Sequence, residues 1–149
     1  MKRILFICLG NICRSPMAET IMQRIVDEKG LTQDFEIDSA GLISYHEGEQ
    51  ADPRMRAHAS RHGYRITHLS RPIRTSDFRH FDLIIGMDAY NMADLRRLVY
   101  PADLPKVRRL LDFAGVNRDV ADPWYTGNFD ETYADVVAGC TALLQTLTC

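Results

Sequence analysis

Hydrophobic and polar positions along the chain predict strands and helices that alternate. Residues 2–8 form an almost continuous apolar run, which is typical of a buried strand. Further strands are predicted at 35–40, 81–87 and 107–111. Helical spacing, together with residues that start and stop helices, predicts helices at 15–30, 52–61, 88–98 and 129–147. The stretches left over as loops or irregular segments are 41–50, 65–79 and 111–128.

This alternation predicts an α/β fold, in which helices cover both faces of a parallel sheet. The chain has 149 residues, the size of one ordinary domain, so we expect a single doubly wound domain over 1–149. In such sheets, ligands bind outside the carboxyl ends of the strands. The first predicted strand ends at Cys8, which makes this the first place to look for chemistry.

The first predicted helix has recognisable ends. Ser15 is expected to cap it, and Pro16 suits its first turn. Glu19 lies early in the helix, where the helix dipole favours an acid, and Gly30 is expected to end it. The residues between Cys8 and Ser15 are therefore predicted to join the end of a strand to the start of a helix.

Composition and charge narrow the class of protein. The hydrophobic fraction of 46% and the charged fraction of 26% are typical of globular domains, and the net charge of -2 predicts no nucleic-acid partner. The apolar run at 4–9 resembles part of a signal peptide, but Gly10 and Asn11 interrupt it, and no other stretch approaches bilayer length. We expect no membrane partner and a cytoplasmic location. The cysteines are then expected to be reduced thiols: Cys8, Cys13, Cys140 and Cys149.

The loop from Cys8 to Ser15 has the composition of a phosphate site. Its backbone amides and the helix N-terminus provide N–H donors and partial positive charge, and Gly10 permits a tight turn. Arg14 adds a planar guanidinium that fits two phosphate oxygens. The same surroundings favour the thiolate of Cys8, which is the nucleophilic form. Cys8 is therefore predicted to attack phosphorus, with the Ser15 hydroxyl assisting the later departure of the sulfur.

A leaving alkoxide or phenoxide needs a proton, and Asp122 is the candidate donor. It lies in a turn-prone Asp-Pro segment inside the long loop at 111–128. Trp124 and Tyr125 follow it and are suited to stacking on an aromatic substrate ring. In the second half of the reaction, Asp122 is expected to activate water against the phosphocysteine.

These residues, in this order and spacing, resemble the low-molecular-weight protein tyrosine phosphatases over nearly the whole chain. The segments that carry the resemblance are Cys-Leu-Gly-Asn-Ile-Cys-Arg-Ser-Pro at 8–16, Asp-Ser-Ala-Gly at 38–41, Asp-Pro-Arg at 52–54, Met87-Asp88 with Asn91, and Asp-Pro-Trp-Tyr at 122–125. The resemblance implies a four-stranded parallel sheet in the order 2-1-3-4, with no metal and no cofactor. It implies phosphotyrosine-containing proteins as substrates, and phosphate and other oxyanions as inhibitors.

The resemblance also assigns roles to individual residues. It implies that Cys8 is the nucleophile, that Arg14 binds phosphate and that Asp122 is the general acid and base. It implies that Asp88 is an acidic partner of Arg14, and that a hydrogen-bonded network shapes the loop through Asn11, Ser15, Ser39 and His68. The residues expected to bind phosphate or line the substrate pocket are Leu9, Gly10, Asn11, Ile12, Cys13, Ser15, Tyr45, Trp124 and Tyr125.

Some positions depart from the family pattern and bear on substrate preference. Trp124 stands where many relatives have Tyr, and Leu42 where they have Thr. The loop at 43–46 lacks the Trp found in relatives, so Tyr45 is expected to form the aromatic wall.

Three alternatives stay open. Ile12 favours an aromatic substrate, since phosphoarginine phosphatases tend to carry Thr there, but a protein-arginine phosphatase of the same fold is one alternative. A redox-sensing or arsenate-reductase-like thiol protein is another, in which Cys8 and Cys13 form a reversible disulfide. Arsenate reductases of this kind need further cysteines mid-chain, and none lies between Cys13 and Cys140. The third is a phosphate-binding module that has lost catalysis.

Overall fold

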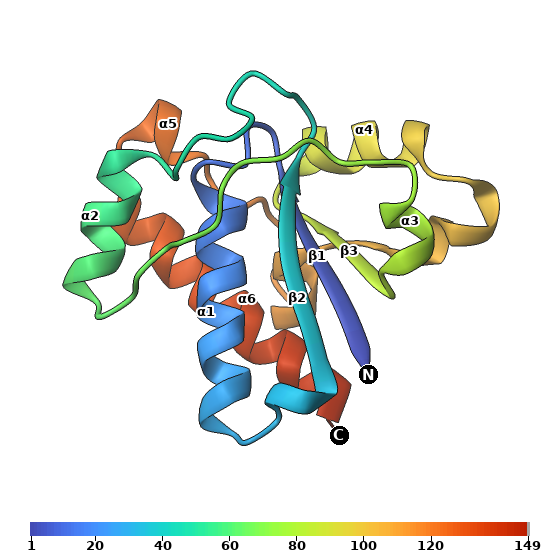
Figure 1. The fold of residues 1–149 in the computed structure, drawn as a ribbon, viewed down its shortest axis with the longest axis horizontal. Coiled ribbons are helices and arrows are strands. Elements are labelled where there is room, and N and C mark those ends of the chain that lie inside the picture. The colour runs from blue at the N-terminus through green and yellow to red at the C-terminus, as the bar shows by residue number, and fades with distance from the viewer. Residues whose placement is uncertain (149) are drawn as a thin grey trace.

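A four-stranded sheet forms the centre of the structure, a computed structural model that describes residues 1–148 (Figure 1). Its strands are β1 Lys2–Cys8, β2 Phe35–Gly41, β3 Leu83–Gly86 and β4 Val107–Arg109. Neighbouring strands are parallel, and their order is β2-β1-β3-β4. The predicted fold class and strand order are confirmed.

Helices cover both faces of this sheet. The long helices α1 Arg14–Glu28 and α6 Phe129–Thr148 pack together on one face, whereas α4 Ala89–Leu98 covers the other (Figure 1). The shorter helices are α2 Pro53–Arg61, α3 Asp77–His80, α5 Pro123–Thr126 and the 3-10 turns Thr32–Asp34, Pro101–Lys106 and Leu110–Ala114. Within residues 1–148, none of the helices has both the length and the apolar character to cross a membrane.

Strand β1 explains why the core has two halves. Its side chains alternate between the faces of the sheet, so Ile4 and Phe6 pack towards α1 and α6, while Leu5 and Ile7 pack towards α4. All four side chains are completely buried. Strand β1 is central and apolar on both faces, so it holds its last residue, Cys8, in a fixed place at the carboxyl end of the sheet.

The predicted strands were correct in number, but two of them are shorter than expected. β3 occupies four residues of the predicted 81–87, and β4 three of the predicted 107–111, because a 3-10 turn takes over at Leu110. Short helices also occur in two segments that were expected to be irregular, namely α3 and α5. In α5, Asp122 caps the helix by accepting a hydrogen bond from the Trp124 amide, a local signal that the sequence does contain.

The prediction that Ser15 caps α1 is wrong. The helix begins at Arg14, with Cys13, two residues before Ser15, at the cap position and no capping bond from a side chain. The Ser15 hydroxyl instead lies against Cys8 and Asn11, so tertiary contacts have taken it from the helix end. Glu19 is likewise outside the first turn and accepts a hydrogen bond from Ser39.

Candidate active site

The loop between β1 and α1 brings the predicted nucleophile close to a helix N-terminus. Cys8 is the last residue of β1 and is 3% exposed, and α1 begins at Arg14. The first N–H groups of a helix have no partners within it and carry partial positive charge. The Sγ of Cys8 lies 3.0 Å from the Ser15 Oγ. A hydroxyl at this distance can donate a hydrogen bond to a thiolate and so stabilise it.

Asn11 holds the middle of this loop in an unusual conformation. Its φ of 57° makes it the only non-glycine residue with a positive φ within residues 1–148. The side-chain Nδ2 of Asn11 donates to Ser15 Oγ at 2.8 Å and to Ser39 Oγ at 3.0 Å. Its Oδ1 accepts a hydrogen bond from the backbone amide of Arg71 at 3.0 Å. His68 Nε2 lies 2.8 Å from the same Oδ1. These contacts offset the cost of the left-handed backbone.

The network continues outward from Asn11 through His68. The other ring nitrogen, Nδ1, lies 3.0 Å from Glu19, which also accepts a hydrogen bond from Ser39 at 2.7 Å. Both nitrogens of the His68 ring therefore lie within hydrogen-bonding distance of an oxygen atom. The predicted network of Asn11, Ser15, Ser39 and His68 is present, and Glu19 extends it.

Close packing of β2 against the loop adds a second restraint. A Cβ atom on Gly41 would lie 3.0 Å from the Leu9 carbonyl oxygen and 3.1 Å from the Asn11 Cβ. Glycine at this position therefore lets the loop backbone lie directly on the end of β2.

Arg14 is buried among acceptors. Its side chain is 3% exposed, and Nη1 donates to Asp88 at 2.7 Å and to the Val120 carbonyl at 2.9 Å. Burial alone would lower the pKa of the guanidinium, but Cys8, Asp122 and Asp88 outweigh burial and raise its pKa. The guanidinium is thus a permanent charge whose orientation is fixed by the predicted partner, Asp88, and by a backbone carbonyl.

Asp122 reaches the same place from the far end of the chain. Its Oδ2 lies 3.4 Å from Arg14 Nη2, while its Oδ1 accepts from the Trp124 amide at 3.0 Å. The side chain of Asp122 is 22% exposed, so it remains accessible from the cavity. The structure therefore brings the predicted nucleophile, phosphate clamp and acid together from residues 8, 14 and 122.

A cavity of about 260 Å³ opens above this group. Asn11 and Ser15 are absent from its lining, because they support the loop from behind. The residues that line it are Cys8, Leu9, Gly10, Ile12, Cys13, Arg14, Ile43, Tyr45, His46, Asp122, Trp124 and Tyr125. The cavity combines a polar floor with an apolar and aromatic rim, which is suited to a ring that carries an anionic group.

Comparison of the sequence with models of protein families identifies the family of this chain. The model described as Low molecular weight phosphotyrosine protein phosphatase matches residues 3–149. The chain belongs to this family. The resemblance noted from the sequence motifs is therefore confirmed.

Relatives within the family match over most of their length. The low molecular weight protein-tyrosine-phosphatase of Streptomyces coelicolor is 44% identical over 149 residues, which cover 95% of this chain and 91% of the relative. A protein tyrosine phosphatase structure from Entamoeba histolytica has a TM-score of 0.94 and 38% identity, with 99% and 97% of the two chains covered. The drosophila arginine phosphatase structure has a TM-score of 0.92 and 34% identity, with 100% and 99% covered. Relatives named for two different phosphorylated residues thus share this fold.

The rim of this low molecular weight phosphatase and its surroundings contain residues that sequence reasoning missed. The His46 ring lies 6.4 Å from the Trp124 ring, and the Arg54 guanidinium lies 5.5 Å from the centre of the same ring. Neither was predicted as a site residue. His46 is adjacent to Tyr45 in a loop already expected to form the wall, which was the available signal. Arg54 does not line the cavity but lies beside Trp124, and its signal was the Asp-Pro-Arg segment at 52–54.

The other described cysteines differ from Cys8 in their surroundings. Burial raises the pKa of Cys13, and the nearby charges of Asp52 and Cys8 raise it further, so Cys13 stays a neutral thiol. Burial raises the pKa of Cys140, which lies in the core against α1. Cys8, Cys13 and Cys140 are all free in this structure, and Cys149 lies outside the described residues. The reversible disulfide between Cys8 and Cys13 stays a prediction.

Proposed function

We propose that this chain hydrolyses phosphotyrosine in proteins through a phosphocysteine on Cys8. The observation that supports this most strongly is the convergence of Cys8, Arg14 and Asp122 on one cavity with an aromatic rim. A module that only bound phosphate would need neither the thiol nor the acid. The thiol chemistry requires a reduced Cys8, which fits a cytoplasmic enzyme.

In the first step, the Cys8 thiolate attacks phosphorus in line with the leaving oxygen. The S–P bond forms as the bond from phosphorus to the tyrosine oxygen breaks, and protonated Asp122 gives its proton to that oxygen. Arg14, the loop amides and the N-terminus of α1 bind the equatorial oxygens, on which negative charge is spread.

In the second step, water replaces the sulfur. Asp122, now a carboxylate, takes a proton from the attacking water as the new P–O bond forms and the S–P bond breaks. The leaving sulfur becomes the Cys8 thiolate again, and the Ser15 hydroxyl 3.0 Å away stabilises it by donating a hydrogen bond. Inorganic phosphate is the product, and it and other oxyanions act as inhibitors by occupying the same loop.

The rim supports an aromatic substrate over a guanidinium. Ile12 presents an apolar side chain to the cavity, and Tyr45, Trp124 and Tyr125 offer ring faces on which a phenyl ring can stack. The arginine phosphatase among the structural relatives makes phosphoarginine the substrate to test against phosphotyrosine.

Release of phosphate from a phosphotyrosine peptide by three variants tests this proposal. Cys8→Ser should lower kcat/KM by at least about 10⁴-fold, because the oxygen is a far weaker nucleophile here. Asp122→Asn should lower kcat by about 10²–10⁴-fold, since the leaving phenoxide then departs without a proton. Cys140→Ala is the matched control and should keep full activity. Undiminished turnover by Cys8→Ser would refute the mechanism, and faster hydrolysis of phosphoarginine would overturn the substrate.

A further inference from the structure

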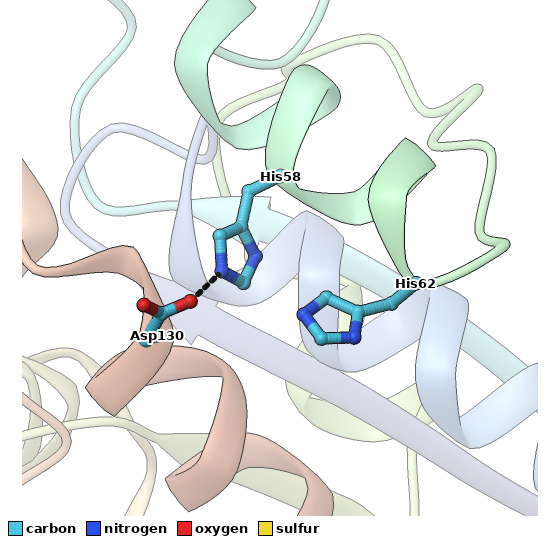
Figure 2. Close-up of side chains that lie close together, drawn as sticks. All are labelled: His58, His62 and Asp130. Atoms are coloured by element: carbon cyan, nitrogen blue, oxygen red, sulfur yellow. Dashed lines mark hydrogen bonds and ion pairs between the residues drawn. The ribbon is translucent and has the colours of Figure 1, made fainter.

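A second cluster of chemically active side chains lies where α2 meets the start of α6, and the proposed mechanism uses none of its members. His58 lies on α2, His62 caps the C-terminal end of this helix one turn later, and Asp130 lies in the first turn of α6 (Figure 2). One ligand atom from each of the three lies within 4.8 Å of the others. Figure 2 shows both imidazole rings and the carboxylate directed towards one another across the junction of the two helices.

His58 is the least expected member of this cluster, because it is only 2% exposed. Its Nε2 lies 2.6 Å from Asp130, and its Nδ1 is buried without a hydrogen-bond partner among the described residues. Buried imidazoles normally have both nitrogens satisfied. This nitrogen lies on the side of the ring that faces His62 (Figure 2).

The surroundings fix the rings and leave one side open. The His62 ring stacks on Tyr133 at 3.9 Å between centroids, and His58 lies 5.6 Å from the same ring. By contrast, Asp130 is 90% exposed in its side chain, and His62 is exposed. A hydrated ion can therefore reach the cluster from solvent while the ring orientations are held from behind.

The charges in the cluster suit a cation. Asp130 offers a carboxylate oxygen, and His58 and His62 offer ring nitrogens, which are ligand types that bind divalent transition metals. The positive charge of Arg61 also acts on Asp130. A comparable trio, formed by Glu19, Asp38 and His68, is already engaged in the network behind Asn11 and is not free to rearrange around an ion.

We propose that His58, His62 and Asp130 bind a divalent transition-metal ion, best represented by Zn²⁺. Two imidazoles and one carboxylate are a zinc ligand set, and water completes the tetrahedron. The family resemblance implied no metal, and the three ligands, which lie up to 72 positions apart, form no local motif in the sequence.

Such an ion would join two elements that flank the active site. α2 begins beside the loop, since the Asp52 amide donates to the Ile12 carbonyl at 2.8 Å. α6 begins directly after the segment that contains Asp122 and Trp124. The ion would therefore act on stability and on the relative position of these helices, without touching the substrate.

Calorimetric titration with ZnCl₂ tests the site in a Cys8→Ser background, which removes the active-site thiolate as a competing ligand. We expect one equivalent to bind, and His62→Gln and Asp130→Asn each to weaken binding at least tenfold. Both altered residues are exposed, so these variants should fold. His80→Gln is the matched control, because His80 pairs with Glu36 in a separate exposed contact and should leave binding unchanged.

Two further measurements make the result decisive. Zn²⁺ should raise the melting temperature by at least about 4 °C in the Cys8→Ser background and not in its His62→Gln derivative. Co²⁺ should give a visible spectrum of nitrogen and oxygen ligands without a thiolate charge-transfer band. Absence of binding, equal binding by all variants, or loss of binding in His46→Gln instead would overturn the proposal. None of these readouts depends on phosphatase activity, so the proposed function is tested separately.

Discussion

The floor and the rim of the active-site cavity are built in opposite ways. Arg14 on the floor and Asn11 directly behind it are at most 2% exposed, and each makes at least three hydrogen bonds to groups distant in sequence. On the rim, Tyr45, Trp124 and Tyr125 are 84%, 51% and 78% exposed. The fold therefore fixes the groups that handle phosphate and leaves the groups that meet the rest of the substrate largely free. Reaction type and substrate preference should respond differently to substitution.

Substituting one arginine of the floor and one arginine beside the rim gives the sharpest test of this contrast. Arg14→Lys keeps the charge but loses the planar fork and its bond to Val120, so kcat/KM for an aryl phosphate should fall about 10³-fold. Arg54→Lys beside the rim should change it less than about threefold, because this side chain is half exposed. Similar losses in the two variants, measured by steady-state kinetics, would remove the distinction.

A smaller effect should separate the two tasks of Asn11. Asn11→Ala loses four hydrogen bonds and places a Cβ residue without a polar side chain at positive φ, so it should cost about 2–4 kcal/mol of unfolding free energy. Asn11→Gly loses the same bonds but tolerates the backbone, so it should cost about 1 kcal/mol less. Urea denaturation gives both values. Equal stabilities would show that the left-handed backbone carries no cost here.

The rim should give the smallest effects, and these should depend on the substrate. Trp124→Ala and Tyr45→Ala should each raise KM for a phosphotyrosine peptide about 2–10-fold with little change in kcat, since stacking on one ring contributes about 0.5–1.5 kcal/mol. A small alkyl phosphate, which cannot stack, should be hydrolysed at an unchanged rate. A fall in kcat for both substrates would instead place these side chains in the chemistry.

The sequence predicted the strand and the helix on either side of the Cys8 loop because their signals are local. A buried strand, a Gly-containing loop and a helix start follow one another within 16 residues, so Cys8 and Arg14 could be assigned from their neighbours alone. The capping role of Ser15 was wrong for the same reason. Propensity describes a helix end in isolation, whereas Cys8 and Asn11 compete for this hydroxyl in the folded chain.

Features that depend on distant contacts were beyond prediction from local pattern. The energetic cost of the positive φ of Asn11 is offset only when Ser39, His68 and Arg71 surround its side chain. The contact between His58 and Asp130 likewise joins residues 72 positions apart, and no sequence motif predicts it. Family resemblance supplied Ser39, His68 and Asp88 where periodicity could not.

The contacts of Arg14 also bear on when the protein becomes an enzyme during its synthesis. Its partners Asp88 and Val120 are 74 and 106 positions further along the chain. At about 5–20 residues per second, the ribosome makes Cys8 several seconds before Val120 exists. A nascent chain therefore carries its thiol long before the arginine beside it can be oriented, and Asp122 arrives later still. Catalytic competence should therefore appear only after Asp122 has been made and has folded onto the loop.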